Sequence, residues 1–456
     1  MPAIKKIYTF VQYIAIILLA GCYSCKNLPE PIMKEHQLSF SAKNHALDNN
    51  DNFSPDDKFL CYDTRGTVYN ENLANSKSIE KIEISTGRET VLWEPESITG
   101  EEAAPGVAAV SWHPSEDKVI FIHGPLLHEI EERGYYNIRN RTGVEVSANG
   151  KGLINKVDYR DVATERPTIS GAQRGGTHRH EYSRNGKRIG FTYDDYLLPE
   201  YDRTIGYMEA HPSAPVGYSH YFAILLKPAK IGKSAPGEIE KAYGDSWADK
   251  DGTMRAFIGK VRAENGVDYY HDLYVTGIPE STNITTASSG DAEKYPEPPS
   301  GIIIRRLTHG YNLQGIVRGS HDGNNIAFLA KDDNEISQIF ITDSYPTYNE
   351  GNAKPEPIQL THFDTDAAFL RWHPSGKFIL AIVDGNIYVV PTATGSKPTL
   401  PLQLTNDNSR RTELVISNDG NTLAYNKKVW HEDLQKQFSQ IFTLKPDWDK
   451  LESFIK

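Results

Sequence analysis

Seven copies of one short turn constrain this chain more than any other feature of its sequence. Each copy is rich in Ser, His, Pro, Asp and Gly, and an apolar stretch follows it, as Ile189, Gly190 and Phe191 follow the turn that ends at Gly186. The copies occupy residues 54–57, 113–117, 183–186, 249–252, 320–323, 373–376 and 417–420. Their last residues stand 44 to 71 positions apart, and repeats of that length are typical of propellers and other repeat folds. The spacing predicts an all-β fold, a seven-bladed β-propeller.

A second repeat supports the count of seven. Leu-Thr pairs end at Thr308, Thr361 and Thr405, and each of these threonines stands 15 residues before the last glycine of the next turn. The 25 tyrosines, 35 glycines and 26 prolines, without a long apolar helical period, also favour strands and turns. The alternative is a loose β-sandwich in which Asp-Gly turns recur by chance.

The N-terminus has the layout of a secretory signal. Two lysines precede an apolar run from Ile7 to Ala20, which ends in Leu-Ala-Gly-Cys22. This ending resembles a bacterial lipobox, which implies a lipid on Cys22. A transmembrane anchor is the alternative, but the run is short for a bilayer. We therefore expect a signal peptide (1–21), a lipidated flexible tether (22–52) and the propeller (53–456), in a protein of the cell envelope that touches the membrane only through its lipid.

Charge and cysteine content exclude several other classes. The formal net charge is −11, so nothing argues for nucleic-acid binding, which needs cations to neutralise phosphates. Only Cys61 accompanies Cys22 and Cys25, which is too few for a disulfide scaffold. We expect a monomer with an anionic oligosaccharide as its partner.

One hairpin, residues 171–195, concentrates polar chemistry. His178 and His180 are two apart on an alternating segment, which places both imidazoles on one face of a strand. In a propeller the inner strand of this blade begins at the rim where the long connections 124–141 and 151–176 also gather, and long loops on one side of a scaffold usually contain its function. The candidate residues at this rim of blades 2 and 3 are His123, Tyr135, Tyr136, Arg139, Arg174, His178, His180, Asp194, Asp195 and Arg203.

These residue types suit proton abstraction beside a carboxylate, as in β-elimination on a uronic acid. An arginine, Arg174 or Arg139, neutralises the carboxylate through its bidentate fork. A histidine, His178 or His180, removes the proton from carbon 5. An acid, chosen from Tyr135, Tyr136 and His123, protonates the oxygen that leaves carbon 4. Arg203, Asp194 and Asp195 complete the expected substrate-binding set. Loss of a sugar would make the enzyme a lyase, and loss of a hydroxyl a dehydratase.

Two resemblances accompany this reading. The Leu-Thr pairs and the segments Trp112-His-Pro-Ser and Trp372-His-Pro-Ser-Gly resemble the blades of TolB-like propellers, and residues 121–125, 174–180 and 191–195 resemble an uncharacterised bacterial family of Tol biopolymer transport-like proteins. Propeller-fold ulvan and oligogalacturonide lyases are similar in fold and in their His, Tyr and Arg residues. The resemblance to TolB implies a rival function, a non-catalytic propeller that binds envelope proteins or saccharide.

The sequence does not decide whether the protein binds a cofactor. His178 and His180 could also hold a divalent metal, with His123 or a rim aspartate as the third ligand. The pair could equally satisfy hydrogen bonds inside a wet channel.

Overall fold

The computed structural model describes residues 33–65, 76–95, 106–150, 152–345, 356–392 and 400–455. The predicted signal peptide, Cys22, Cys25 and residues 22–32 of the predicted tether lie outside these ranges. Within the described ranges, no helix is long and apolar enough to cross a membrane.

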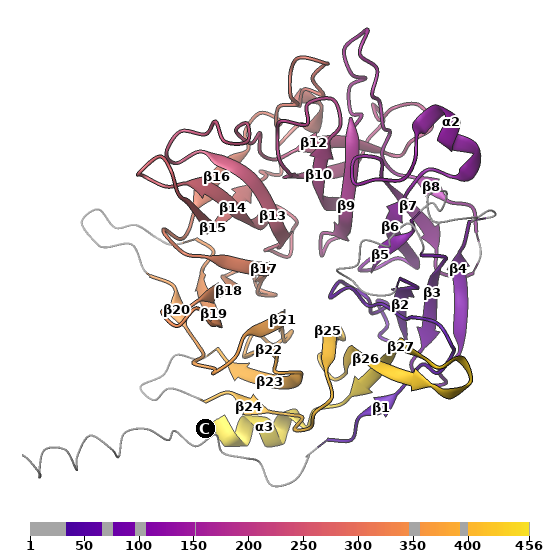
Figure 1. The fold of residues 1–456 in the computed structure, drawn as a ribbon, viewed down its shortest axis with the longest axis vertical. Helices are drawn as coiled ribbons and strands as arrows, with labels where there is room; N and C mark the ends of the chain where they lie inside the picture. Colours follow the sequence, from indigo (N-terminus) through magenta and orange to yellow (C-terminus); the bar gives the residue numbers. More distant parts are fainter. Residues whose placement is uncertain are drawn as a thin grey trace, which may run out of the picture.

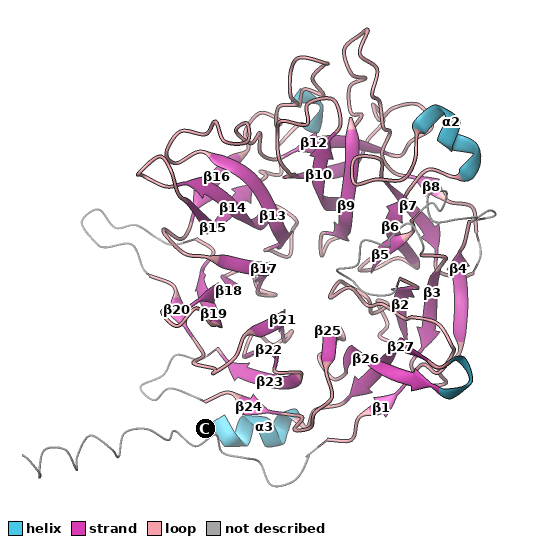
Figure 2. Ribbon diagram, viewed as in Figure 1, coloured by secondary structure: helices cyan, strands magenta, loops and turns pink. Residues whose placement is uncertain are grey.

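Seven antiparallel sheets surround a common axis, so the prediction of an all-β, seven-bladed propeller is confirmed (Figures 1 and 2). From the inside outwards, blade 1 contains β2(Phe59–Asp63), β3(Ile79–Glu83) and β4(Glu89–Trp93), and blade 2 contains β5(Ala108–Trp112), β6(Lys118–His123), β7(Thr142–Ser147) and β8(Asn155–Lys156). Blade 3 contains β9(Gly175–Tyr182), β10(Arg188–Asp195), β11(Thr204–Ala210) and β12(His220–Ile224). Blade 4 contains β13(Ile239–Trp247), β14(Met254–Arg262), β15(Tyr269–Gly277) and β16(Ile303–Arg306).

In the same order, blade 5 contains β17(Leu313–Gly319), β18(Asn325–Lys331), β19(Ser337–Asp343) and β20(Ile358–Gln359). Blade 6 contains β21(Ala367–Trp372), β22(Phe378–Val383), β23(Asn386–Pro391) and β24(Leu402–Gln403). Blade 7 contains β25(Arg411–Ile416), β26(Leu423–His431), β27(Lys436–Leu444) and β1(His36–Gln37). Short helices, η2(Leu127–Glu129), α2(Ile130–Arg133), η3(Ile284–Thr286), η4(Glu432–Leu434) and α3(Trp448–Ile455), complete the described elements.

The ring closes by joining the two ends of the chain in blade 7. Strand β1 pairs with β27, the last strand of the chain, as its outermost neighbour. Residues 33–52 therefore belong to the propeller, where the sequence predicted a tether. The Asn/Asp run misled the prediction because these side chains satisfy the backbone of the fold: Asn52 Nδ2 donates to the Cys61 carbonyl at 2.9 Å, and Asn49 Nδ2 to the Leu414 carbonyl at 2.6 Å.

In blades 2 to 7 the repeated turn joins the inner strand of the blade to its second strand, and in blade 1 the turn at residues 54–57 directly precedes β2. In four of them a serine hydroxyl accepts the backbone N–H five residues on: Ser54 from Phe59 at 3.0 Å, Ser183 from Arg188 at 3.0 Å, Ser320 from Asn325 at 3.0 Å and Ser417 from Thr422 at 2.9 Å. Five of the turns end in a glycine with a positive φ, as Gly186 shows at 72°. This left-handed conformation explains why glycine recurs there.

The inner strand of each of blades 2 to 7 contains a β-bulge that the sequence pattern did not predict. At each bulge the pairing register shifts, and one residue adopts a left-handed φ: Ala109, Arg179, Gly244, Gly315, Phe369 and Glu413. A bulge re-aims the side chains on either side of it. Because Arg179 stands between His178 and His180, the simple alternation predicted for these two histidines is interrupted.

Apolar side chains fill the space between the sheets of neighbouring blades. Phe257 and Trp247 of blade 4 pack with Tyr207 of blade 3, whereas Ile258 of blade 4 packs with Phe328 of blade 5. Alternate residues of one strand thus face opposite neighbours, as the period of two in a β-strand dictates. This packing holds neighbouring blades together and fixes where the strand ends place their polar residues.

Candidate functional site

His178 lies between a carboxylate and a guanidinium near the start of β9. Its Nε2 is 2.8 Å from Asp194 Oδ2 on β10, and its Nδ1 is 2.9 Å from Arg141 Nη1, just before β7. Because a guanidinium only donates hydrogen bonds, Nδ1 is the acceptor and the Nε2–H donates to Asp194. Burial and the charges of Arg141 and Arg203 lower the pKa of His178 to about 3. His178 is thus neutral at pH 7, and its basic lone pair faces Arg141.

Asp194 holds both His178 and Arg203. Its Oδ2 accepts from Arg203 Nε at 2.8 Å and lies 2.7 Å from Arg203 Nη2. Burial alone would raise the pKa of Asp194, but the hydrogen bond from His178 and the charge of Arg203 outweigh it and hold the pKa well below its usual value. Asp194 is therefore an anion that fixes the tautomer and orientation of His178.

Arg141 has no carboxylate partner. Its side chain is 9% exposed, its Nε has no hydrogen-bond partner, and no salt bridge to it occurs among the described residues. The ring of Tyr136 covers it at 5.0 Å, and the buried Tyr136 hydroxyl is also without a hydrogen-bond partner. Burial lowers the pKa of Arg141, although Asp194 acts in the opposite direction, as expected for a buried cation without a directly paired anion. We name Tyr136, Arg141, His178, Asp194 and Arg203 the Arg141 cluster.

His180 occupies a different environment from His178. It is fully buried, its Nε2 lies 3.0 Å from Thr177 Oγ1, and that hydroxyl donates to Asp158 at 3.0 Å. A Cβ placed on Gly143 would meet this imidazole at 2.8 Å, so the ring is tightly enclosed. Burial lowers the pKa of His180 to about 3. The structure gives His180 a packing role rather than access to a ligand.

His123 lines a separate pocket of about 480 Å³ on the outer side of blade 2. Its ring meets Trp93 edge-on at 4.8 Å, its Nε2 has no hydrogen-bond partner, and burial lowers its pKa to about 4. Tyr135 is 56% exposed, and Arg139 reaches only the Pro199 carbonyl, at 3.5 Å. No hydrogen bond or ion pair links any of these three described residues to His178, and of the acids proposed from sequence only Tyr136 joins the Arg141 cluster.

Arg174 and Asp195 form a buried ion pair. Arg174 Nε and Nη2 donate to Asp195 Oδ2 at 3.0 and 2.8 Å, and Arg174 Nη1 donates to the carbonyls of Asp291 and Lys294. Both side chains are fully buried. Their shared function is to hold the loop after η3 against blade 3, and neither is accessible to a substrate.

We expect Arg174→Ala to reduce stability by about 3–5 kcal/mol, because the change leaves Asp195 as a buried charge without its cation. The free energy of unfolding, measured in urea, tests this. Arg139→Ala is the matched control, since an arginine near the surface should change stability by less than about 0.5 kcal/mol. If Arg174→Ala unfolds in urea like the wild type but binds substrate more weakly, Arg174 belongs to the substrate-binding residues after all.

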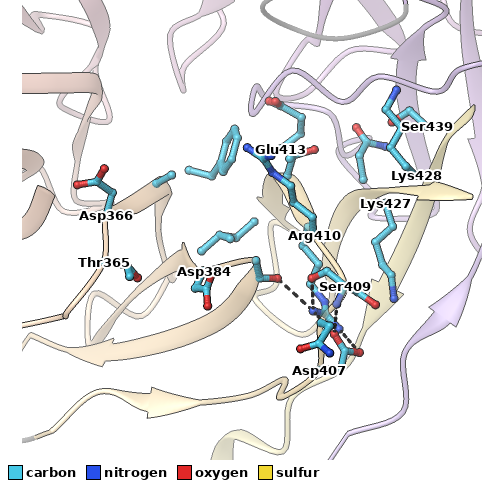
Figure 3. Close-up of a pocket in the computed structure, with 18 of the residues that line it drawn as sticks. Thr365, Asp366, Asp384, Asp407, Ser409, Arg410, Glu413, Lys427, Lys428 and Ser439 are labelled. Carbon is cyan, nitrogen blue, oxygen red and sulfur yellow. Dashed lines mark hydrogen bonds and ion pairs between the residues drawn. The ribbon is translucent and has the colours of Figure 1, made fainter. Parts of the chain in front are cut away.

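A pocket that sequence reasoning missed lies elsewhere on the same face of the ring. It measures about 900 Å³ and lies between blades 6 and 7, with Glu413 among its lining residues (Figure 3). Glu413 is 4% exposed, and its Oε2 has no hydrogen-bond partner. Burial and Asp48 raise its pKa to about 8, although Arg65 and Arg179 act in the opposite direction. Nothing in the local sequence marks this glutamate, because its environment comes from blades 1, 3 and 7.

The described residues contain no group of three or more His, Cys, Asp or Glu side chains arranged to hold a metal ion. In the Arg141 cluster both nitrogens of His178 are engaged, one by Arg141 and the other by Asp194. The residues present therefore do not fit the divalent metal considered from the sequence.

Comparison with known proteins places this site inside a matched family region. Residues 106–219 match a family described as "Protein of unknown function (DUF3748)", a range that contains the whole Arg141 cluster. Over 420 residues the chain is 30% identical to "Uncharacterized protein YidR" of Escherichia coli (strain K12), a match that covers 85% of this chain and 94% of that protein.

Solved structures match in fold. An oligogalacturonate lyase from Vibrio parahaemolyticus has a TM-score of 0.51 at 9% identity, covering 93% of this chain and 96% of its own. An oligogalacturonate lyase in complex with manganese has a TM-score of 0.50 at 10% identity, covering 93% and 99%. At such identities the likeness concerns the fold alone, which agrees with the resemblance to propeller lyases noted from the sequence.

Two further matches are looser. The putative TolB from Agrobacterium tumefaciens has a TM-score of 0.35 at 14% identity, covering 78% of this chain and 86% of its own. A prolyl endopeptidase has a TM-score of 0.47 at 13% identity, and the match covers 85% of this chain. The chain spans about half the length of that protein, 49%.

Proposed function

The chain belongs to the family of the Escherichia coli protein YidR, and we propose that it catalyses β-elimination on a uronic-acid-containing oligosaccharide at the Arg141 cluster. The supporting observation is the Arg141 guanidinium, which is buried without a carboxylate partner and donates to the only basic atom of His178. A buried cation of this kind favours an anion of fitting shape, and a carboxylate matches the planar fork of an arginine. The fold shared with oligogalacturonate lyases is consistent with this chemistry.

The reaction follows from what a substrate carboxylate does to Arg141. When the uronate pairs with the guanidinium, Arg141 turns from His178 Nδ1 and frees the lone pair of this nitrogen. The pairing also neutralises the carboxylate, which makes the proton on carbon 5 more acidic. His178 Nδ1 takes this proton, and Asp194 stabilises the imidazolium that forms through the Nε2–H bond.

Tyr136 completes the elimination as the acid. As the electron pair of the C5–H bond forms the double bond between carbons 4 and 5, the C4–O bond breaks, and the Tyr136 hydroxyl gives its proton to the departing oxygen. Burial raises the pKa of Tyr136 above its usual value, so the hydroxyl is protonated at neutral pH. The products are an unsaturated uronate and either a shortened sugar chain, for a lyase, or water, for a dehydratase.

Access requires a local movement. Tyr136 lies over Arg141, and the cluster reaches the surface at Arg203, whose side chain is 31% exposed. A substrate carboxylate therefore approaches past Arg203 and displaces the Tyr136 ring from the guanidinium, which brings the phenol beside the leaving oxygen. The manganese in the related lyase belongs to that protein, and no step here passes through a metal.

We also propose that the predicted signal peptide exports the enzyme and that a lipid on Cys22 anchors it in the cell envelope.

Incubation of the purified protein with uronate oligosaccharides from ulvan, pectin and alginate tests the proposal. We expect ultraviolet absorbance from a conjugated unsaturated uronate to grow with at least one of them. If none of the three substrates yields it, while one binds unchanged, the elimination chemistry is refuted and a saccharide-binding propeller is left.

The pH dependence gives a further prediction. In the free enzyme, burial, Arg141 and Arg203 lower the pKa of His178 to about 3. Bound uronate cancels the charge of Arg141, which raises the pKa of His178 in the complex. Because kcat reports the complex and kcat/KM the free enzyme, we expect the acidic limb of kcat to lie at higher pH than the acidic limb of kcat/KM. Coincident limbs would contradict the role of Arg141 as the group that the substrate neutralises.

A further inference from the structure

The pocket between blades 6 and 7 is separate from the Arg141 cluster, yet opens on the same face of the ring. Its walls include Asp384, just after β22, and residues 407–413, which lead into β25. Asp194 and His178 occupy the corresponding strand ends in blade 3, on β10 and β9. The volume of about 900 Å³ falls within the roughly 300–1,000 Å³ that is typical of ligand sites.

The charges in this pocket are nearly balanced. Arg411 lies 3.0 Å from Asp407 and 2.7 Å from Glu35, and Lys427 lies 3.1 Å from Glu35, so these three lining residues are paired. The remaining charged groups on the wall are Asp366 and Asp384 on one side and Arg410 and Lys428 on the other. In Figure 3 the two aspartates face the two lysines across the pocket, with Arg410 and Glu413 between them. Such a wall suits an uncharged, polar ligand better than a polyanion.

The lining also pairs an apolar patch with many hydrogen-bonding groups. Phe369, Ala368 and Ile382 supply the patch, and hydroxyl, amide and carboxylate groups surround it. Phe369 is held at the bulge of β21 with a φ of 54°, a conformation that is uncommon outside glycine and persists only where its surroundings enforce it. A sugar ring presents the matching surface, an apolar face of C–H groups and an edge of hydroxyls that both donate and accept.

Glu413 adds an unpaired group at the wall of this pocket. Its Oε2 has no hydrogen-bond partner, and its φ of 55° places it at the bulge of β25. Asp48, Asp63, Arg65 and Arg179 surround it from blades 1 and 3, and Arg410 and Lys428 share the pocket. Burial and Asp48 keep its pKa at about 8, so the carboxyl is mainly protonated at neutral pH and can donate a hydrogen bond.

We propose that this pocket is a second saccharide site, which binds a neutral sugar unit with Phe369 against the apolar face of the sugar and the Glu413 carboxyl donating a hydrogen bond to one of its oxygens. The inference goes beyond the elimination reaction, because the occupant is not the reacting uronate. Together with that reaction it points to heteropolymers that contain both neutral sugars and uronates.

Calorimetric titration with three neutral probes, cellotriose, xylotriose and maltotriose, tests this, with trigalacturonate as the charged counterpart. At pH 7 we expect the His178→Ala protein to bind at least one neutral trisaccharide more tightly than it binds trigalacturonate. The affinity for that trisaccharide should fall about tenfold between pH 7 and pH 9.5, because Glu413 ionises and no longer donates a hydrogen bond. Glu413→Gln keeps a donor that does not titrate, so it should bind equally well at both pH values. Lys428→Gln should retain the pH dependence, which separates the titration of Glu413 from that of the lysine.

Phe369→Ala should abolish this binding, and circular dichroism establishes that each variant is folded. The proposal is overturned if none of the neutral probes binds, or if Glu413→Gln keeps the same pH dependence as the wild type. Since calorimetry needs no turnover, a failure of the elimination reaction and a failure of this second site are seen separately.

Discussion

His178→Ala is expected to lower kcat on a uronate oligosaccharide by about 10²–10⁴-fold, the usual contribution of a general base, while the protein stays folded. The imidazole is the only group in the Arg141 cluster with a lone pair that a bound carboxylate would free. Asp194 keeps its ion pair with Arg203 at 2.7 Å in the variant, so no buried carboxylate is left without a cation. Initial rates from ultraviolet absorbance, with thermal unfolding measured on the same samples, check this result.

The matched control is His362→Ala, which removes an exposed histidine from the connection between blades 5 and 6. Its rate should equal that of the wild type. KM should change little in His178→Ala, because Arg141 still binds the carboxylate. An undiminished kcat in His178→Ala would remove this residue from the mechanism, and an equal loss in both histidine variants would point to a general effect on the fold.

Steep loss of stability in mild acid is the second large effect that we expect. Burial lowers the pKa values of His178 and His180 to about 3 and of His123 and His220 to about 4, from an ordinary value of 6.5. Between about pH 6.5 and pH 4 the unfolded chain therefore binds protons that the folded protein does not, and stability falls as the pH falls. Each histidine contributes a slope of about 1.4 kcal/mol per pH unit, so four contribute about 5 kcal/mol per unit.

This slope is large beside the roughly 5–15 kcal/mol that stabilises a typical domain. Glu413, Asp158 and Asp63 act in the opposite direction, because a raised pKa gives stability that is lost as the pH rises, from about 4.5 to about 8 for Glu413 and from about 3.8 to about 6 for Asp158. The buried histidines outnumber them, because burial also lowers the pKa of His321 to about 4. Urea unfolding at pH 7.5, 6 and 5 measures the effect. His220→Gln should make the slope shallower by about 1.4 kcal/mol per pH unit. A free energy of unfolding that is constant from pH 7.5 to pH 5 would show that these histidines are not buried neutral groups.

The candidate site was predictable in part. The strand pattern places His178, Asp194 and Arg203 near one another, and they do meet, because register within one hairpin and its next strand is a local property. His180 was expected as an alternative base to His178 on the same face of the strand, but the bulge at Arg179 interrupts their alternation, and Gly143 of blade 2 leaves room only for a packed ring. Arg174 was expected to bind substrate, yet Asp195 and the carbonyls of Asp291 and Lys294 enclose it.

The sequence by itself determined the seven blades, since each blade needs its own turn and its own pair of apolar strands, and these signals are local. Only the tertiary structure decided that residues 33–52 close the ring, that Arg141 has no anion beside it, and that Glu413 keeps its proton. The physical reason is that burial and the sum of nearby charges depend on which blades face one another. The pattern of residues within one blade does not specify which side chains and charges its neighbouring blades place against it.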